Sequence, residues 1–575
     1  MSRAPARRSG VVLLASTLCF VAAGAARAQS GRQWRPEERV LVTRFADAYG
    51  LAADLRNLYV ATNGGLEVYD FVGRRWAVPV TVEDGFPAAE RPTALAYDRF
   101  HDDVWMATST GGIYTYSGAF GQWSRKATSP AAPIHRIVMD PGGSGDLYFA
   151  APGGWLRLRQ GSLLLEPVGP GQVPPGLGSP GSGAAALLQA DPYLRSALGT
   201  LSLDERGRRW PITAIIGADV PATYWVGTDG GNVARFDSRT MQPEWLRFGV
   251  PSFGVASVAA DDDALWFGAD GRGPGRGVTR ASADLQSWRT WEPDLDNAPA
   301  GAVSRVLPTA AAVWFGAADG LYRLDRERGR FQRIEESDGL PADAVAALAP
   351  AADGVWAGTR RGLALVGDDG RVRAPAVLAG HAVAHLALSG DTLWISSDAG
   401  LWVIPAASAA GTPTAPARPP AAERDGATAD STARPAPAAA TTTTAGPALL
   451  PTPLVAPGTE NHAALRGRVL AAAPVAGAVW AVTSDALYRF DGANWLVVRD
   501  PTLGSIGRPT SLASDDGQLW VAGARGIAHF DPASQIWTSY TVGADLPAGP
   551  VWSVLPRGDD VWAATPAGAL RLRWR

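Results

Sequence analysis

Cysteine, lysine and long apolar stretches are nearly absent from this chain of 575 residues. The single cysteine, Cys19, lies in an apolar run near the N-terminus, so no disulfide or thiolate metal site is expected in the rest of the chain. Lys126 is the one lysine, and 52 basic residues face 55 acidic ones, for a formal net charge of −3. This balance gives no reason to expect nucleic acid or an anionic membrane as a partner.

The first 28 residues have the pattern of a secretory signal peptide. Arg3, Arg7 and Arg8 precede an apolar run over 11–25 that is short for a membrane span. Ala26-Arg27-Ala28 fits an A-x-A site, so we expect cleavage after Ala28. No later apolar run reaches about 18 residues, so no transmembrane segment is expected in the mature chain. The expected location is the bacterial periplasm or the exterior of the cell.

A repeated unit of two short strands dominates the rest of the sequence. In its clearest copy, Val313–Asp325, an apolar strand ends at Gly316, Asp319-Gly320 predicts a tight turn, and a mixed strand follows. One such hairpin is marginal in water, so the copies must stack on one another. An aromatic residue marks the same position in eleven copies: Tyr59, Trp105, Tyr148, Trp225, Trp266, Trp314, Trp356, Trp394, Trp480, Trp520 and Trp562.

The spacing of these aromatics predicts the architecture. Successive separations are 46, 43, 77, 41, 48, 42, 38, 86, 40 and 42 residues, so two of the ten are near twice the common value. A period of about 40–45 residues with four strands per unit is typical of a β-propeller blade. The chain is therefore predicted to be all-β, with about eleven four-stranded blades. Because one ring usually holds about four to eight blades, two rings are favoured.

Two interruptions divide the array into segments. Residues 161–210 form a Gly/Pro-rich insertion with a helical stretch over 184–198, and residues 405–465 form an Ala/Thr/Pro-rich linker predicted to be disordered. The remaining segments are the first propeller blades over 29–160, the middle blades over 211–404 as a second ring or a continuation, and the C-terminal blades over 466–575.

The order of the segments also suggests how the rings close. The last unit ends after its third strand, and 34–45 forms a strand before the first copy, so the N-terminal strand is expected to complete the C-terminal blade. The preferred arrangement joins the first three and last three blades in one ring. The middle five, from Trp225 to Trp394, then form a second ring inserted within it. A sequential split into two rings is the alternative.

The repeat resembles that of the two-component regulator propeller family. Tyr224–Gly231 and Val355–Leu363 are closest to its Val-Trp-x-Gly-Thr-x-x-Gly-Leu pattern, and Asp338-Gly339-Leu340-Pro341 matches the segment that follows it. The resemblance implies a periplasmic sensor-type propeller, commonly part of a membrane histidine kinase and often responding to glycans. This sequence shows no kinase, receiver or membrane span after the propellers. A sensor role would therefore act through a separate membrane protein.

The aromatic row is predicted to pack between neighbouring blades, and no catalytic or cofactor-binding residue is assigned. Trp291 and Trp402 fall outside the common register and are the better candidates for a ligand surface. The acids that end several repeats are interpreted as turn caps: Asp70, Asp237, Asp325, Asp491 and Asp531.

No metal-binding residue and no cofactor are predicted. Calcium at 261–263 or 368–369 is an alternative, although no 12-residue calcium loop is present. His381 and His385 are four residues apart on an expected strand, too far apart for one zinc ion.

Together these features favour an exported, non-catalytic propeller that binds a ligand or a protein in the bacterial envelope. The expected partner is a glycan, an envelope protein or a separate membrane sensor. One alternative is a propeller enzyme, either a glycosidase or lyase acting on polysaccharide or a quinone-dependent dehydrogenase. A glycosidase needs two facing carboxylates about 5–10 Å apart, which one sequence cannot show. A second alternative is an envelope assembly scaffold, since a propeller fold does not by itself select a function.

Overall fold

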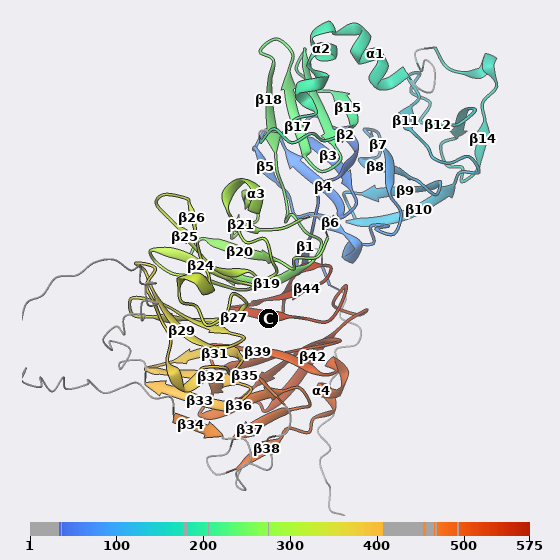
Figure 1. The fold of residues 1–575 in the computed structure, drawn as a ribbon. Helices are drawn as coiled ribbons and strands as arrows, with labels where there is room; N and C mark the ends of the chain where they lie inside the picture. Colours follow the sequence, from blue (N-terminus) through green and yellow to red (C-terminus); the bar gives the residue numbers. More distant parts are fainter. Residues whose placement is uncertain are drawn as a thin grey trace, which may run out of the picture.

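The computed structural model describes residues 34–35, 37–175, 177, 182–204, 206–273, 275–405, 452–455, 465, 468–490 and 494–575. The predicted signal peptide, its cleavage site after Ala28 and most of the predicted linker lie outside these residues. The described residues form eleven antiparallel sheets, ten with four strands and one with five. This confirms the all-β class and the blade architecture (Figure 1).

Seven of these sheets form a ring. Their strands, blade by blade, are β19 (Val255–Ala260), β20 (Ala264–Ala269), β21 (Val278–Ser282) and β22 (Trp288–Trp291); β23 (Val303–Pro308), β24 (Ala312–Ala317), β25 (Gly320–Asp325) and β26 (Phe331–Ile334); β27 (Val345–Ala351), β28 (Gly354–Thr359), β29 (Gly362–Gly367) and β30 (Val372–Arg373); β31 (Val383–Ser389), β32 (Thr392–Ser397), β33 (Gly400–Pro405) and β34 (Thr452–Val455); β35 (Val469–Val475), β36 (Ala478–Thr483), β37 (Leu487–Phe490) and β38 (Trp495–Val497); β39 (Pro509–Asp515), β40 (Gln518–Gly523), β41 (Gly526–Asp531) and β42 (Ile536–Thr541); and β43 (Ser553–Arg557), β44 (Asp560–Thr565), β45 (Gly568–Arg573) and β1 (Arg39–Val42).

The other four sheets form a second lobe, which we call the arc. Its strands are β2 (Ala48–Ala53), β3 (Asn57–Thr62), β4 (Gly65–Asp70), β5 (Arg75–Trp76) and β6 (Val80–Thr81); β7 (Pro92–Asp98), β8 (Asp103–Thr108), β9 (Gly112–Ser117) and β10 (Gln122–Thr128); β11 (Arg136–Met139), β12 (Leu147–Ala151), β13 (Gly154–Leu158) and β14 (Leu165–Pro167); and β15 (Ile212–Gly217), β16 (Thr223–Thr228), β17 (Asn232–Asp237) and β18 (Gln242–Leu246). The α-helices are α1 (Ser182–Ala190), α2 (Pro192–Leu201), α3 (Pro293–Asp296) and α4 (Pro501–Ile506), and short 3-10 turns cover Val82–Asp84, Pro170–Gln172, Glu336–Asp338 and Ala376–Leu378.

The ring is closed by its innermost strands and by the N-terminal strand. The inner strands contact one another in the order β19, β23, β27, β31, β35, β39 and β43, and β43 returns to β19. Strand β1 pairs antiparallel with β45, from Arg39 opposite Leu572 to Val42 opposite Ala569. This confirms the prediction that the N-terminal strand completes the C-terminal blade. On the resulting blade, the Trp562 ring lies 5.7 Å from that of Phe267 in the first blade, edge to face. This contact buries the seam between the last and first blades.

The arc is not closed in the same way. Its inner strands contact one another in the order β15, β2, β7 and β11, but β11 and β15 do not pack together as the other neighbours do. Helices α1 and α2 lie on this side (Figure 1), where α1 contacts β15 and Leu194 of α2 joins the core of the β15–β18 blade. Arg136 of β11 donates from Nη1 to the Leu177 carbonyl at 3.3 Å, so the segment leading to the helices also contacts the opposite blade.

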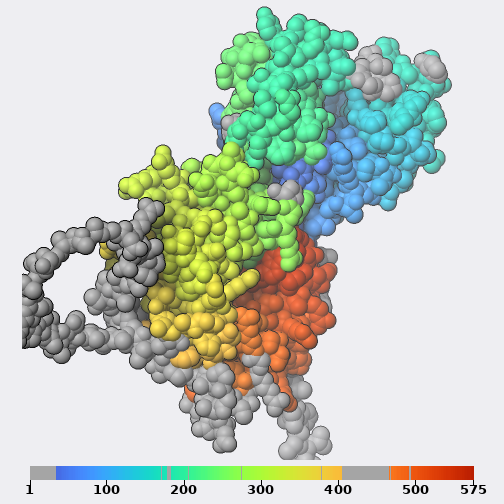
Figure 2. Space-filling view, in the orientation of Figure 1, coloured from blue at the N-terminus to red at the C-terminus, as the bar shows by residue number. Residues whose placement is uncertain are grey.

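The arc is inserted into the ring between β1 and β19. The chain crosses from ring to arc over 43–47 and returns over 247–254. These two crossings bridge at Arg44 and Gly249, and the Phe45 and Phe248 rings lie 5.3 Å apart. Space-filling atoms show the blue-to-green arc as a lobe beside the yellow-to-red ring (Figure 2).

The preferred arrangement of rings was therefore wrong, although one unit is indeed nested within the other. The fourth blade joins the first three, and the other middle blades join the C-terminal ones. The crossing at 247–254 lies within an ordinary 41-residue spacing between Trp225 and Trp266, so no length signal marks it. The two long interruptions lie elsewhere, one inside the arc and one inside a single ring blade.

Two predicted segment boundaries also need correction. Strand β14 lies inside the predicted insertion over 161–210 and is the outer strand of the third blade. Strand β34 lies inside the predicted disordered linker over 405–465, yet it pairs with β33 as the outer strand of its blade. Both strands are only three or four residues long and adjoin sequence rich in small residues and proline, which follows β14 and precedes β34, so hydrophobic periodicity did not reveal them.

All eleven repeat aromatics lie in the second strand of a blade. Nine are buried, while Trp105 and Trp394 are half-buried. Trp314, for example, packs with Val345 and Val355 of the following blade. Gly320 in the turn after it has φ 154°, a conformation that favours glycine. Burying one such ring contributes about 4–6 kcal/mol, so this row is a principal source of stability.

Candidate binding site in the central channel

A cavity of about 380 Å³ occupies the centre of the ring. Six inner strands of the ring and Trp552, directly before the seventh, contribute to its wall or its entrance, so seven blades surround one channel. The lining residues are Ala256, Asp270, Arg272, Ala302, Ser304, Arg305, Ala346, Ala384, Leu470, Thr510, Ser511 and Trp552. The volume lies within the range of about 300–1,000 Å³ that small-molecule sites occupy.

The entrance lies on the face where the inner strands begin. Asp270 and Arg272, in the loop between β20 and β21, lie here together with Ala302, which precedes β23. In each of these two blades a turn amide donates to the residue before the inner strand: Asp270 to the Gly254 carbonyl at 3.2 Å and Ala318 to the Ala302 carbonyl at 3.0 Å. This hydrogen bond therefore identifies the entrance side of any blade in the ring.

Hydroxyl groups on the inner strands seal adjacent blades around the channel. Ser257 and Ser304 each donate through Oγ to a carbonyl of the next inner strand, at 2.6 Å. Thr510 donates through Oγ1 to the carbonyl of Val551, two residues before β43, again at 2.6 Å. Small side chains at these positions allow the strands to approach closely. The polar lining is thus largely engaged in holding the ring together.

Arg305 differs from this pattern because its guanidinium has no hydrogen bond or ion pair within the described part of the chain. It is the third residue of β23, directly after the bulge at Ser304, and His385 occupies the equivalent position of β31. Burial lowers the pKa of Arg305. Burial, and then the charge of Arg305, lower the pKa of His385 to about 3, so the imidazole is neutral at physiological pH. The cavity therefore contains an unpaired positive charge.

Trp552 provides the aromatic surface at the entrance, directly before β43. The guanidinium of Arg272 lies 5.4 Å from the centre of its ring, a cation–π contact that holds the arginine at the mouth. Among the described residues, Asp270 is the only acid that lines the cavity, and its Oδ1 accepts the Arg272 backbone N–H at 3.0 Å. The mouth thus combines an aromatic face with charges that are predominantly positive.

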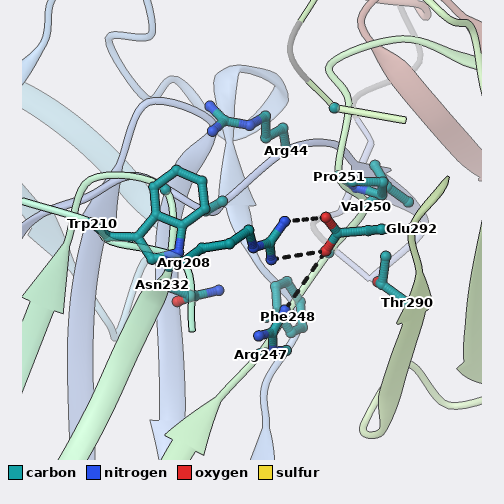
Figure 3. A pocket seen from close by; sticks show the side chains of 15 residues that line it. Arg44, Arg208, Trp210, Asn232, Arg247, Phe248, Val250, Pro251, Thr290 and Glu292 are labelled. Carbon is teal, nitrogen blue, oxygen red and sulfur yellow. Dashed lines mark hydrogen bonds and ion pairs between the residues drawn. The ribbon is translucent and has the colours of Figure 1, made fainter. Parts of the chain in front are cut away.

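A second, smaller cavity of about 140 Å³ lies where the arc meets the ring (Figure 3). Arg208, which precedes β15, contacts both carboxylate oxygens of Glu292 from the ring, one of them at 3.0 Å. Arg206 reaches the same carboxylate at 3.1 Å and Arg247 at 4.0 Å. Trp210 and Phe248 complete the wall. This volume is below the usual range for small ligands, so we assign the cluster to holding the arc against the ring.

Asp204 supports this junction from the side of the arc. Its buried carboxylate accepts hydrogen bonds from the Trp210 indole and the Arg208 guanidinium, both at 3.1 Å. Burial acts to raise its pKa, but the Trp210 bond, the backbone N–H bonds and the Arg208 charge outweigh it, so the pKa is lowered. The group is therefore a fixed negative charge that orients Arg208 toward Glu292.

The structure places the other sequence candidates away from the channel. Trp291 is buried and stacks on Trp266 at 5.6 Å, so the proposal that it forms a ligand surface was wrong. Trp402 is half-buried beside the core of the β31–β33 strands. His381 bonds to Asp398 at 3.2 Å, separate from the buried His385.

The acids that end the repeats do cap turns where they are described. Asp70 accepts the backbone N–H of Gly73 at 2.7 Å, and Asp325 accepts that of Arg328 at 2.8 Å. Asp237 and Asp531 accept in the same way, whereas Asp491 lies outside the described residues. Among the described residues no group of three or more His, Cys, Asp or Glu is arranged to hold a metal ion. No described helix is long and apolar enough to cross a membrane.

Sequence reasoning missed the channel residues Arg305, Arg272 and Trp552. Arg305 did carry a signal, since it is a charged residue at an inner-strand position where the other ring copies, apart from His385, carry serine or alanine. Trp552 immediately precedes its strand and was counted with that apolar strand. Their convergence depends on ring closure, which brings β23 and β43 to one channel.

No protein-family model matches the chain, and a comparison with curated proteins gives no match. Among solved structures, the extracellular domain of BT4673 from B. thetaiotaomicron, assigned to a one-component system, is similar at 13% identity and a TM-score of 0.38. The match covers 92% of this chain and 64% of that one. PorZ, a surface component of the type-IX secretion system of Porphyromonas gingivalis, is similar at 12% identity and a TM-score of 0.41, over 93% of this chain and 74% of that one.

The same comparison includes extracellular domains of BT4673 and BT3049 assigned to hybrid two-component systems. These belong to the class of protein that the repeat resemblance implies. At these identities and TM-scores the similarities carry no argument about ligand, partner or activity.

Proposed function

We propose that the chain is a non-catalytic binding propeller that receives its ligand, or a segment of a protein partner, at the entrance of the ring channel. The observation that carries this proposal is the cavity of about 380 Å³ that is lined by residues from all seven blades. Its entrance presents Trp552, Arg272 and Arg305 rather than a filled core. An aromatic face with a few polar groups is the usual composition of a small-molecule site.

The chemistry of the cavity supports binding over hydrolysis. A glycosidase uses two carboxyl groups on either side of the bond that it cleaves. Asp270 is the one acid among the described residues that line the channel. The neutral His385 is buried below the lining residues, with no carboxylate partner among the described residues to orient it as a base. These features supply contacts for a ligand but not a pair of groups for acid and base catalysis.

The proposed setting is the bacterial envelope, reached through the predicted signal peptide. There the chain would bind a glycan or an envelope protein, and it would transmit a signal only through a separate membrane sensor. The arc, held by the Glu292 cluster, gives such a partner a second surface whose position relative to the channel is fixed.

A ligand screen with matched variants tests this function. The protein is screened by thermal shift against oligosaccharides and envelope extracts, in wild-type form and as Trp552→Ala. A ligand at about 100 times its Kd should stabilise the wild type by about 2.7 kcal/mol. The control is Phe120→Ala, which removes an aromatic ring that is 80% exposed on the arc.

We expect the shift to be lost in Trp552→Ala and retained in Phe120→Ala. Equal binding by both variants would place the site outside the channel. Turnover of any ligand by the wild type would replace the binding function with an enzymatic one.

A further inference from the structure

We infer that the channel entrance recognises a ligand through a negatively charged group, namely a carboxylate, sulfate or phosphate. This inference rests on the proposed function, because it names the chemistry of the ligand at that same site. Two observations carry the inference. The arginines at the entrance have no ion pair among the described residues, and the carboxylates beside them accept local hydrogen bonds.

The first step is the charge inside the cavity. The Arg305 guanidinium lines the channel without a hydrogen-bond or ion-pair partner in the described part of the chain. A partly desolvated cation is costly unless a counter-charge meets it. Neighbouring alanines such as Ala346 and Ala384 leave space beside it. A planar guanidinium in such a site is suited to two parallel hydrogen bonds with an oxyanion.

The second step is the charge around the entrance. The entrance side of a blade is identified by the hydrogen bond from a turn amide to the carbonyl of the residue before the inner strand. In three further blades an arginine is the donor or the acceptor of this bond. Arg360 donates to Ala344, Ser484 donates to Arg468, and Ala524 donates to Arg508. All three arginines are exposed, and none has an ion pair within the described residues. With Arg272 at the mouth, four of the seven blades present an arginine on the entrance face of the ring.

The third step is the state of the nearby acids. Asp319 accepts the backbone N–H of Gly301 at 3.0 Å and the Tyr322 hydroxyl at 2.7 Å. Asp398 accepts from Ala382 and His381, and Asp343 accepts the backbone N–H of Glu336 at 2.7 Å. These carboxylates accept local hydrogen bonds but keep their negative charge, whereas the arginines have no ion pair among the described residues. The attraction for anions is therefore strongest where Arg305 and Arg272 meet the cavity, which Asp270 alone lines among the described acids.

The experiment measures binding of small anions to the full mature protein by isothermal titration calorimetry. The probes are tripolyphosphate, sucrose octasulfate and hexaglutamate, and their neutral counterparts are sucrose and hexaglutamine. We expect at least one anionic probe to bind, and raising NaCl from about 0.05 M to about 0.5 M to weaken it by about tenfold or more through screening. The probe that binds most tightly distinguishes phosphate, sulfate and carboxylate as the source.

Four variants locate the site and its charge. Arg305→Gln should weaken binding by about tenfold or more, and Arg305→Lys should retain part of it, since a charge remains without the planar fork. Asp270→Asn should tighten binding by about two- to fivefold, because it removes the one acid that lines the cavity. The control is Arg328→Gln, whose side chain is 80% exposed in the turn between β25 and β26, on the opposite face.

Near-UV circular dichroism verifies that each variant is folded. A higher affinity of Asp270→Asn for the anionic probe cannot arise from misfolding. Binding that is equal in Arg305→Gln and wild type, or lost equally in Arg328→Gln, would overturn the inference. Binding of a neutral ligand that depends on Trp552 but not on Arg305 would overturn it too, while leaving the proposed function intact. Absence of binding by every anionic probe would exclude the anionic class.

Discussion

The ring and the arc are built from the same four-stranded blade, yet only the ring closes on itself. In the ring the last blade is completed by β1 and packs against the first. In the arc the corresponding side, between β11 and β15, is occupied by α1, α2 and the segment that leads to them. The comparison shows that one blade sequence supports both outcomes, and that closure depends on which elements meet at the seam.

The repeat aromatics are buried to a similar extent in the two regions, with one half-buried ring in each. Six of the seven in the ring and three of the four in the arc are buried. In the arc, Trp105 is half-buried and lines a groove with Lys126, Asp103 and Gln160. We therefore expect substitution of the fully buried Trp314 in the ring to cost more stability than substitution of Trp105.

The largest expected effect comes from breaking the seam of the ring. Val42 is fully buried in β1 and packs with the core that joins the last and first blades. Val42→Asp places an unpaired charge there and should lower the free energy of unfolding by about 4 kcal/mol or more. Hydrogen exchange should accelerate in β19 and β43. Val72→Asp, on an arc side chain that is 70% exposed, should change stability by less than about 0.5 kcal/mol.

The second effect compares equivalent aromatics in the two regions. Trp314→Ala in the ring should cost about 3–5 kcal/mol, because it leaves a large cavity in a closed core. Trp105→Ala in the arc should cost about 2 kcal/mol, since part of its ring already faces water. Urea denaturation of both variants measures the difference. Equal costs would show that the exposed part of Trp105 does not reduce its contribution to packing.

The third effect is a pH dependence of opposite sign in the two regions. In the arc, burial raises the pKa of Glu67 well above its ordinary value of 4.5, and both carboxyl oxygens lack partners in the described structure. The folded state therefore favours the protonated acid. Stability is lost as pH rises above the unfolded value, by about 1.4 kcal/mol per pH unit until the folded pKa is passed. Glu67→Gln should be more stable than wild type at pH 7.5 and similar at pH 4.

In the ring, His385 makes the folded state less stable as pH falls, opposite to the effect of Glu67. Its folded pKa of about 3 lies below the ordinary value of 6.5, so its contribution is complete above pH 6.5 and is lost as pH falls toward 3. His385→Gln should lose less stability than wild type between pH 6.5 and 5. Scanning calorimetry of both variants at several pH values measures these differences. If the stability of both variants relative to wild type changed in the same direction with pH, the assigned protonation states would be contradicted.

The smallest effect concerns the contact between the two regions. Glu292→Gln weakens the cluster with Arg206 and Arg208 and should cost about 1 kcal/mol, as expected for partly exposed ion pairs. Small-angle scattering should show a wider distribution of arc positions. Glu327→Gln, at an exposed acid in the turn after β25, is the control. An unchanged scattering profile for Glu292→Gln would assign the arc position to the apolar contact of Phe45 with Phe248 alone.

Much of the fold followed from local sequence pattern. The register of the aromatic row and the order of strands in each blade were visible because a hairpin is formed by residues close in sequence. The closing role of the N-terminal strand was visible because the last unit lacks a fourth strand and one unpaired strand precedes the first unit. The assignment of blades to rings was not visible. The crossing at 247–254 is no longer than an ordinary loop between blades, so neither length nor composition distinguishes it.

The candidate site shows the same division. Arg305 and Trp552 are far apart in the sequence, and only ring closure brings them to one channel. Trp291 was expected at a surface, but the stacking contact with Trp266 buries it. By itself, the sequence determined the blade, its repeat and its all-β class, because alternating apolar positions and tight turns act over a few residues. The tertiary structure alone decided the number of blades in the ring, the open arc and the charged entrance, because these depend on which distant surfaces exclude water together.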